Sequence, residues 1–206
     1  MARYTGPKVR LSRRLGTNIF ENDKGRKALE RRPFPPGAHG RDRRRNSGSE
    51  YLAQLQEKQK AKYIYGVLER QFKRTYEEAV RQQGPTGENL LRLLELRLDN
   101  VTYRMGFATS RAQARQLVGH GHFAVNGRPT NIPSFQLKPG DKIEVREGRR
   151  AREPFKLAKE TLKNHQAPEW LSIDAATLAG TVADFPRRDQ MPLDLNEQLV
   201  VEYYSR

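Results

Sequence analysis

Cysteine is absent from the 206 residues of the chain. This absence excludes disulfide bonds, thiolate metal sites and a cysteine nucleophile, and it fits a cytoplasmic protein. The sequence also lacks an apolar run of transmembrane length and the apolar core of a signal peptide, so we expect a cytoplasmic protein that does not enter a membrane. Glycine-rich phosphate loops, a Ser/His/Asp constellation and carboxylates paired for acid–base chemistry are missing too, which argues against an enzyme with a small-molecule substrate.

Acidic residues are few relative to basic ones. The chain has 39 Lys and Arg against 24 Asp and Glu, and its net charge is +15. Residues 1–50 hold 14 basic and 5 acidic residues (+9), residues 51–100 hold 9 and 7 (+2), residues 101–150 hold 9 and 3 (+6), and residues 151–206 hold 7 and 9 (−2). Two basic blocks of this kind indicate a polyanionic partner, and we expect that partner to be nucleic acid.

The first 48 residues show no sustained hydrophobic periodicity, and Pro7, Pro33, Pro35 and Pro36 interrupt them. Such a segment cannot bury enough apolar surface to fold alone, so we predict a basic extended N-terminal arm. Two interpretations stay open: a disordered basic tail, or an arm that becomes ordered when its arginines pair with RNA phosphates. The candidate RNA-binding residues of the arm are Arg3, Arg10, Arg13, Arg14, Arg32, His39, Arg41, Arg43, Arg44 and Arg45.

A helical region is predicted over residues 47–83. Apolar residues such as Val67, Leu68 and Phe72 recur at steps of three and four, and Gly84-Pro85 ends the pattern. We expect this stripe to be core. The opposite face carries Lys58 and Lys60 among other charged residues, and an ordinary solvated face explains it as well as a binding face does.

The stretch from Ser110 to Asn131 carries the densest set of structural signals. Ser110 is a good helix N-cap, Gln113 stands at the capping-box position, and Gly119 is placed where a helix commonly ends. Arg111 and Arg115 are one turn apart, so their guanidinium groups are expected on the same side.

A hairpin is predicted after this short helix, because residues 123–125 read as a strand and Asn126-Gly127 is a strong turn signal. It adds His120, His122, Asn126 and Arg128 to a compact basic surface suited to a phosphate backbone. The alternative is a solvated basic helix beside an ordinary hairpin.

The flanking segments predict a module with its own core. Leucines at helical spacing indicate one helix over residues 90–105, and Ile143 and Val145 alternate with charged residues as in a half-buried strand. Further on, residues 149–165 are compatible with a helix, and residues 170–173 and 199–204 are expected to be short strands.

Several runs together resemble the bacterial ribosomal protein S4 family. They are L-E-L-R-L-D-N-V-T-Y-R-M-G-F-A, S-R-A-Q-A-R-Q-L-V-G-H-G-H and V-N-G-R-P-T-N-I-P-S in the module, with R-Y-T-G-P, E-R-R-P-F-P-P-G-A-H-G and N-E-Q-L-V-V-E-Y-Y-S-R near the two ends. The resemblance implies an α+β protein with a basic arm (1–48), a discontinuous mainly helical domain (49–87 plus 155–206) and an inserted RNA-binding module (88–154). We expect that module to have two short helices and a short-stranded sheet.

The resemblance also implies a function. A protein of this family would bind 16S ribosomal RNA directly, nucleate assembly of the small-subunit body and contribute to translational accuracy beside proteins S5 and S12, with messenger RNA near its entry as a further neighbour. It favours RNA contact by Lys58, Lys60 and Arg104 in addition to the module residues. The mildly acidic C-terminal part is expected to meet protein, through Asp189, Glu202, Tyr203 and Tyr204.

Two departures bear on these expectations. Many members of the family bind zinc in the arm through four cysteines, but Val9 and Ser12 stand where the first pair would fall, so we predict no metal and no cofactor.

Arg97-Leu98-Asp99 is similar to a short signature of pseudouridine synthases, RNA-modifying enzymes that can carry the same module. We disfavour that alternative because a separate catalytic domain is missing, and we expect Asp99 to pair with a nearby arginine or backbone amide.

Overall fold

The computed structural model describes residues 4–41, 49–162, 164–191 and 194–206. The chain divides into two compact units. The first unit comprises residues 1–87 and 194–206, and the second comprises residues 88–193. Helices occur in both units and an antiparallel sheet in the second, which confirms the α+β class.

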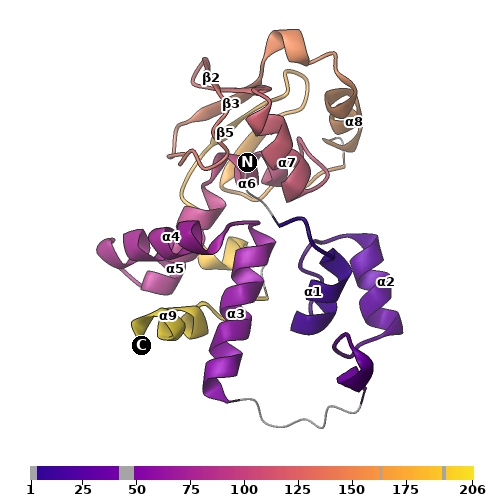
Figure 1. The fold of residues 1–206 in the computed structure, drawn as a ribbon. Helices are drawn as coiled ribbons and strands as arrows, with labels where there is room; N and C mark the ends of the chain where they lie inside the picture. Colours follow the sequence, from indigo (N-terminus) through magenta and orange to yellow (C-terminus); the bar gives the residue numbers. More distant parts are fainter. Residues whose placement is uncertain (1–3, 42–48, 163, 192–193) are drawn as a thin grey trace. The chain divides into compact units, whose positions relative to one another are not determined.

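The N-terminal arm contains helices where the sequence analysis expects extended chain. Helices α1 (Lys8–Leu15) and α2 (Asp23–Arg31) lie side by side (Figure 1), and a short 3₁₀ helix η1 (Ala38–Gly40) follows them. Asn22 caps α2 by accepting a hydrogen bond from the Gly25 amide at 2.7 Å, and Ile19 between the helices is buried. Each helix is too short to show a periodic pattern; α1 has no side-chain cap at its N-terminus and ends at Gly16, whose φ is 72°. The predicted RNA contacts Arg3, Arg43, Arg44 and Arg45 lie outside the described residues.

The rest of the first unit is formed by α3 (Glu50–Ile64), α4 (Glu69–Arg81) and α9 (Glu197–Ser205). The predicted helical region is interrupted at Gly66, whose φ of 63° favours glycine. The strand expected over residues 199–204 is wrong, because these residues belong to α9. The Asn196 side chain caps α9 at the amides of Gln198 and Leu199, and α9 packs beside α3.

A five-stranded antiparallel sheet organises the second unit. Its strands are β1 (Phe123–Val125), β2 (Arg128–Thr130), β3 (Lys142–Val145), β4 (Leu171–Asp174) and β5 (Ala179–Val182), in the order β2-β1-β3-β5-β4. Phe123 pairs with Val145 and Ile143 pairs with Gly180, so these residues share the face that points to the core. The opposite face carries polar and small side chains such as Lys142, Thr181 and Ser172.

Helices α6 (Leu98–Arg104), α7 (Arg111–Gly119) and α8 (Glu153–Leu162) contribute buried residues to the core of the second unit. The single helix expected over residues 90–105 is interrupted, because α5 (Thr86–Glu95) ends before Arg97. Arg97 has extended backbone and forms a β-bridge with Gln136, which takes it out of any helix. None of the helices in the described ranges is long and apolar enough to cross a membrane.

The segment after the module packs with the module itself. Strands β4 and β5 extend its sheet through the pairing of β3 with β5, and Phe155, Trp170 and Val182 belong to its core. The sequence-based division assigns residues 155–206 to the helical domain. In the structure residues 155–193 fall in the second unit, and only residues 194–206 return to the first.

Candidate nucleic-acid interface

Ser110 caps the N-terminus of helix α7 as the sequence predicts, whereas the Gln113 side chain bonds the Thr109 amide and not the Ser110 amide of a capping box. The Ser110 hydroxyl accepts a hydrogen bond from the Gln113 amide at 3.3 Å, and the Gln113 side chain accepts one from the Thr109 amide at 2.7 Å. Ala114 and Val118 on the inner side of the helix are fully buried. The helix is therefore a rigid carrier for its arginines.

Both arginines of α7 make contacts within the protein. The Arg111 Nε donates to Asn100 Oδ1 at 2.9 Å, and its guanidinium lies 4.6 Å from the centre of the Tyr103 ring. Arg115 Nη1 lies 3.2 Å from Asp99 Oδ2. Burial lowers the pKa of Arg115, although Asp99 opposes that shift. Arg115 thus serves the fold, and Arg111 is held in place by α6.

Asp99 is the centre of a buried ion-pair group. Arg97 donates to both of its carboxylate oxygens, at 3.1 and 2.9 Å, and Arg115 adds a third contact. The expectation that Asp99 pairs with a nearby arginine is confirmed. Arg104, a predicted RNA contact, is engaged in the same way, because its Nε and Nη2 donate to the buried Glu95 carboxylate at 2.9 and 2.7 Å.

The residues of the hairpin region differ in exposure. His120 and Arg128 are exposed, whereas His122 is only 5% exposed and its ring stands edge-on to Phe155. Burial lowers the pKa of His122, and Arg152, Arg149, His120 and Arg146 lower it further. Asn126 adopts a positive φ of 50°, and its side chain donates to Asp141 and accepts from the Lys142 amide, so it shapes the turn.

In the arm, Arg13 is a structural residue. Its guanidinium donates to the backbone carbonyl oxygens of Arg32, Phe34 and Pro35 at 3.0–3.4 Å and lies 5.1 Å from the centre of the Phe34 ring. Arg41 also lies over the Phe34 ring, at 5.2 Å. The other described candidates of the arm are exposed, and they are Arg10, Arg14, Arg32 and His39.

The remaining predicted contacts of the first unit face their own chain. Lys58 has a side chain only 4% exposed and donates to Glu69 at 2.9 Å, and Lys60 pairs with Glu57.

Among the residues predicted to meet another protein, Glu202 accepts from Gln54, Tyr203 lies beneath Lys58, and Tyr204 donates to Glu69 at 2.7 Å. In the second unit, Asp189 is exposed in the 3₁₀ helix η3 (Arg188–Gln190).

Four further arginines follow β3, and none of them is among the predicted RNA-binding residues. Arg146, Arg149, Arg150 and Arg152 lie in and around the 3₁₀ helix η2 (Glu147–Arg149). The signal that could have found them is the run R-E-G-R-R-A-R, in which three arginines repeat every third residue.

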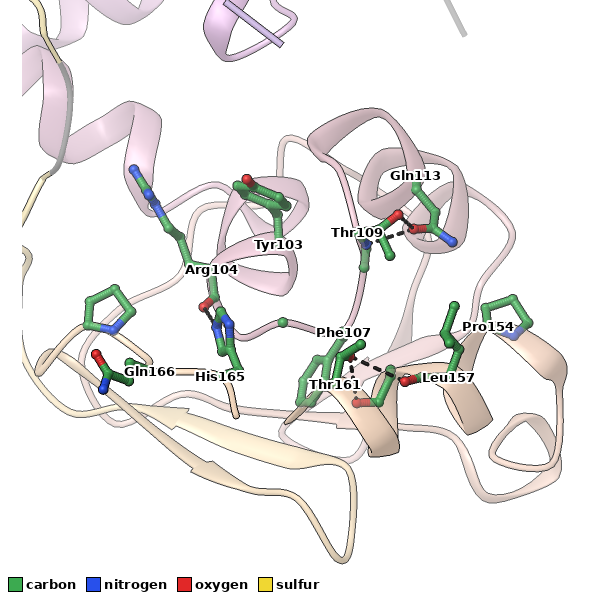
Figure 2. Close-up of a pocket in the computed structure, with 14 residues that line it drawn as sticks. Tyr103, Arg104, Phe107, Thr109, Gln113, Pro154, Leu157, Thr161, His165 and Gln166 are labelled. Atoms are coloured by element: carbon green, nitrogen blue, oxygen red, sulfur yellow. Dashed lines mark hydrogen bonds between the residues drawn. The ribbon is translucent and has the colours of Figure 1, made fainter. Parts of the chain in front are cut away.

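A pocket of about 390 Å³ lies between the loop that follows α6 and helix α8 (Figure 2). Phe107 and Leu157 contribute apolar wall, and His165 Nε2 lies 2.8 Å from the Arg104 carbonyl oxygen. None of the described residues that line the pocket is Asp or Glu, so they provide no paired carboxylates for acid–base chemistry.

Metal-binding groups are not evident in the described ranges, where no three His, Asp or Glu residues come together around a common point. Val9 is exposed and Ser12 is buried. These two residues stand where the first zinc ligands of many family members would fall. The absence of zinc stays a prediction.

Comparisons with known proteins agree with this organisation. A family model described as ribosomal protein S4/S9 N-terminal domain matches residues 3–95, and a model described as S4 domain matches residues 96–143. The small ribosomal subunit protein uS4 of Chloroflexus aurantiacus is 57% identical over 100% of both chains. The proteins of the same name from Roseiflexus castenholzii and Rubrobacter xylanophilus are 57% and 55% identical, also over 100% of both chains. These full-length matches confirm the resemblance, and the chain belongs to the family of small ribosomal subunit protein uS4.

Proposed function

We propose that the chain is a primary 16S rRNA-binding protein that nucleates assembly of the body of the small ribosomal subunit and contributes to translational accuracy. It acts by binding and carries out no catalysis. Its exposed cations neutralise phosphates where RNA helices converge, so the protein holds that RNA in one fold.

The observation that carries the proposal is the distribution of charge on α2. Lys24, Lys27 and Arg31 follow each other at steps of three and four residues, so they share one face of the helix, and all three are exposed. On the same helix Arg26 pairs with Asp23 and with Glu30. One face of α2 therefore balances its own charges, and the other presents three cations for an external polyanion.

Charge also supports protein neighbours for the C-terminal part. Asp184 and Asp189 are exposed there. Their carboxylates would be repelled by RNA phosphates, which carry the same sign of charge. We propose that this surface meets a basic neighbour, with proteins S5 and S12 as the candidates, and that messenger RNA passes near the protein at its entry to the ribosome. The site of action is then the cytoplasmic ribosome.

Filter binding of the full-length protein to 16S rRNA across a salt series tests the proposal. If six or more phosphates are neutralised, the slope of log affinity against log salt should be about −4 or steeper, at roughly 0.7–0.9 per phosphate. Duplex DNA of equal charge should bind more weakly, because the protein recognises folded RNA. A slope close to zero, or equal affinity for the duplex, contradicts the proposal.

A further inference from the structure

The chain between β3 and α8 turns tightly, and three arginines lie on successive turns of it. The Arg149 amide donates to the Arg146 carbonyl oxygen at 2.8 Å, and the Arg152 amide donates to the Arg149 carbonyl oxygen at 3.1 Å. These bonds join residues three apart, and residues 147–149 form the 3₁₀ helix η2 between them. The two bonds therefore hold Arg146, Arg149 and Arg152 on successive turns of one short segment.

This segment begins against Gly121 and His122. The Arg146 amide donates to the His122 carbonyl oxygen at 3.0 Å, and the Arg146 Nη1 donates to the Gly121 carbonyl oxygen at 3.1 Å. The centre of the His120 ring lies 6.3 Å from that of the His122 ring. Burial lowers the pKa of His122, and all three arginines and His120 lower it further. Arg150 turns away, because its Nε donates to the Val145 carbonyl oxygen and its side chain lines the polar face of the sheet.

The cluster has few internal counter-charges. Within the described ranges, neither Arg149 nor Arg152 makes an ion pair or a side-chain hydrogen bond. Glu153 pairs with Lys156 on α8, and Glu147 is exposed. Arg146, Arg152 and His120 are exposed. Like charges held this close repel one another, and an external anion removes that repulsion.

We propose that Arg146, Arg149 and Arg152, together with His120, form a phosphate-binding site for the backbone of the ribosomal RNA. The proposal rests on the proposed function and assigns to it a contact surface outside the arm. Guanidinium groups suit this ligand because their planar fork matches phosphate oxygens, and a row of three matches a repeating anion better than a single carboxylate. His122 sits behind the row and senses whether it is occupied.

A pair of double variants tests the site in the full-length protein. Arg149→Gln with Arg152→Gln removes two charges from the cluster, and Arg146 is kept because it also binds the Gly121 carbonyl oxygen. The control, Lys156→Gln with Lys159→Gln, removes the same charge from the neighbouring helix α8, where both lysines are exposed. Affinity for 16S rRNA should fall at least about tenfold in the cluster variant, and its salt slope should become shallower by about 1.5. The control should stay within about twofold of the wild type.

The imidazole of His122 provides a second readout by NMR titration. A phosphate at the cluster cancels the field of the arginines, so RNA binding should raise the pKa of His122 in the wild-type protein. In the cluster variant the pKa of His122 should already be raised without RNA, and RNA should change it little.

The outcomes separate this site from the function on which it rests. Wild-type protein that binds 16S rRNA with a steep salt slope, beside a cluster variant that binds as the control does, overturns the site and leaves the function standing. An unchanged pKa of His122 on RNA binding does the same. If the cluster variant loses affinity only for an acidic protein neighbour, the anion is a carboxylate surface and the proposal is wrong. Wild-type protein that does not bind 16S rRNA overturns both.

Discussion

Arg13 shows how a single residue organises the arm. Its guanidinium donates hydrogen bonds to the carbonyl oxygens of Arg32, Phe34 and Pro35, which lie about twenty positions further along the chain. Three prolines in this stretch, Pro33, Pro35 and Pro36, have no amide to form regular structure, so the carbonyl oxygens need an external donor. A planar group with several N–H donors satisfies them together, which a lysine ammonium does less well.

Replacing Arg13 with Lys should therefore loosen the arm while preserving its charge. We expect the local opening free energy to fall by about 1 kcal/mol, so the amides of Arg32 and Gly40 should exchange with solvent about fivefold faster. Hydrogen exchange followed by NMR measures this. Arg14→Lys is the matched control, because Arg14 is the exposed neighbour. Equal exchange in the two variants would show that Arg13 does not hold the segment.

Glu69 plays a comparable part in the other half of the first unit. Partial burial acts to raise its pKa, but hydrogen bonds from Lys58, Lys62 and Tyr204 together outweigh that effect and lower the pKa from 4.5 to about 2. Burial, and then the hydrogen bond to Glu69, raise the pKa of Tyr204. Glu69 is the counter-charge for Lys58, whose side chain is buried.

A carboxylate with a lowered pKa in the folded state contributes stability above its unfolded pKa and loses it as the pH falls. The contribution of Glu69 should thus be complete above about pH 4.5 and disappear towards pH 2. Glu69→Gln should lower the unfolding free energy at pH 7 by about 1–2 kcal/mol, reduced by the exposure of this carboxylate. The difference from wild type should close between pH 4.5 and 2 in thermal unfolding. The exposed Glu77→Gln serves as control, and a difference that is constant with pH would contradict this role.

At the scale of the elements, β5 approaches helix α6 at Gly180. A Cβ at this position would lie 2.9 Å from the Sδ and Cε atoms of Met105, which is fully buried, and 2.9 Å from the Ser172 carbonyl oxygen. The methionine could shift, but the backbone oxygen of the neighbouring strand cannot move without disturbing the sheet.

Gly180→Ala should destabilise the protein by about 1–3 kcal/mol through this overpacking, measured by chemical denaturation. Gly148→Ala is the control, because nothing lies within 4 Å of a Cβ there and its backbone does not need glycine. Its effect should stay within about 0.5 kcal/mol. If both variants unfold alike, the sheet accommodates the added methyl group.

Local signals in the sequence predict the elements that local interactions determine. The Ser110 cap, the end of α7 at Gly119 and the turn at Asn126-Gly127 all stand where the pattern places them, because each depends on neighbouring residues. The sheet strand at Ile143 follows from alternation in the same way.

Elements that depend on residues distant in the sequence cannot be predicted from local sequence signals. The run L-V-V-E-Y-Y favours a strand by composition, yet the Asn196 cap and the packing against α3 make it helix α9. Arg97 interrupts a leucine-periodic helix because its partner Gln136 is about forty residues away. For the candidate interface, positive charge is readable from the sequence, but whether an arginine serves the fold or an external partner is not. Arg104 and Arg115 contact buried carboxylates that only the folded chain brings close.

Over the whole molecule, charge separates the arm from the C-terminal part. The described residues 4–41 hold 10 Lys and Arg against 3 acidic residues, a net +7, whereas residues 151–206 have a net charge of −2. In the structure, fewer charged residues than predicted are free to give the arm and the C-terminal part different partners. In the arm they are the exposed cations, among them Lys24, Lys27 and Arg31 of α2. Near the C-terminus they are exposed carboxylates such as Asp189, because Glu202 is engaged by Gln54.

The division predicts opposite results for two variants. Lys24→Gln with Lys27→Gln and Arg31→Gln should weaken binding to 16S rRNA and make the salt slope shallower by about 2–3, since each exposed cation accounts for about one unit. The fold should survive, because none of the three side chains is buried. Asp189→Lys should leave binding to isolated 16S rRNA almost unchanged, and its effect should emerge in the assembled subunit as a weaker protein contact and altered decoding accuracy. Filter binding of both variants under identical salt compares them directly. If Asp189→Lys changes RNA affinity as much as the α2 variant does, the C-terminal part also lies beside RNA, and the two ends of the chain do not have separate partners.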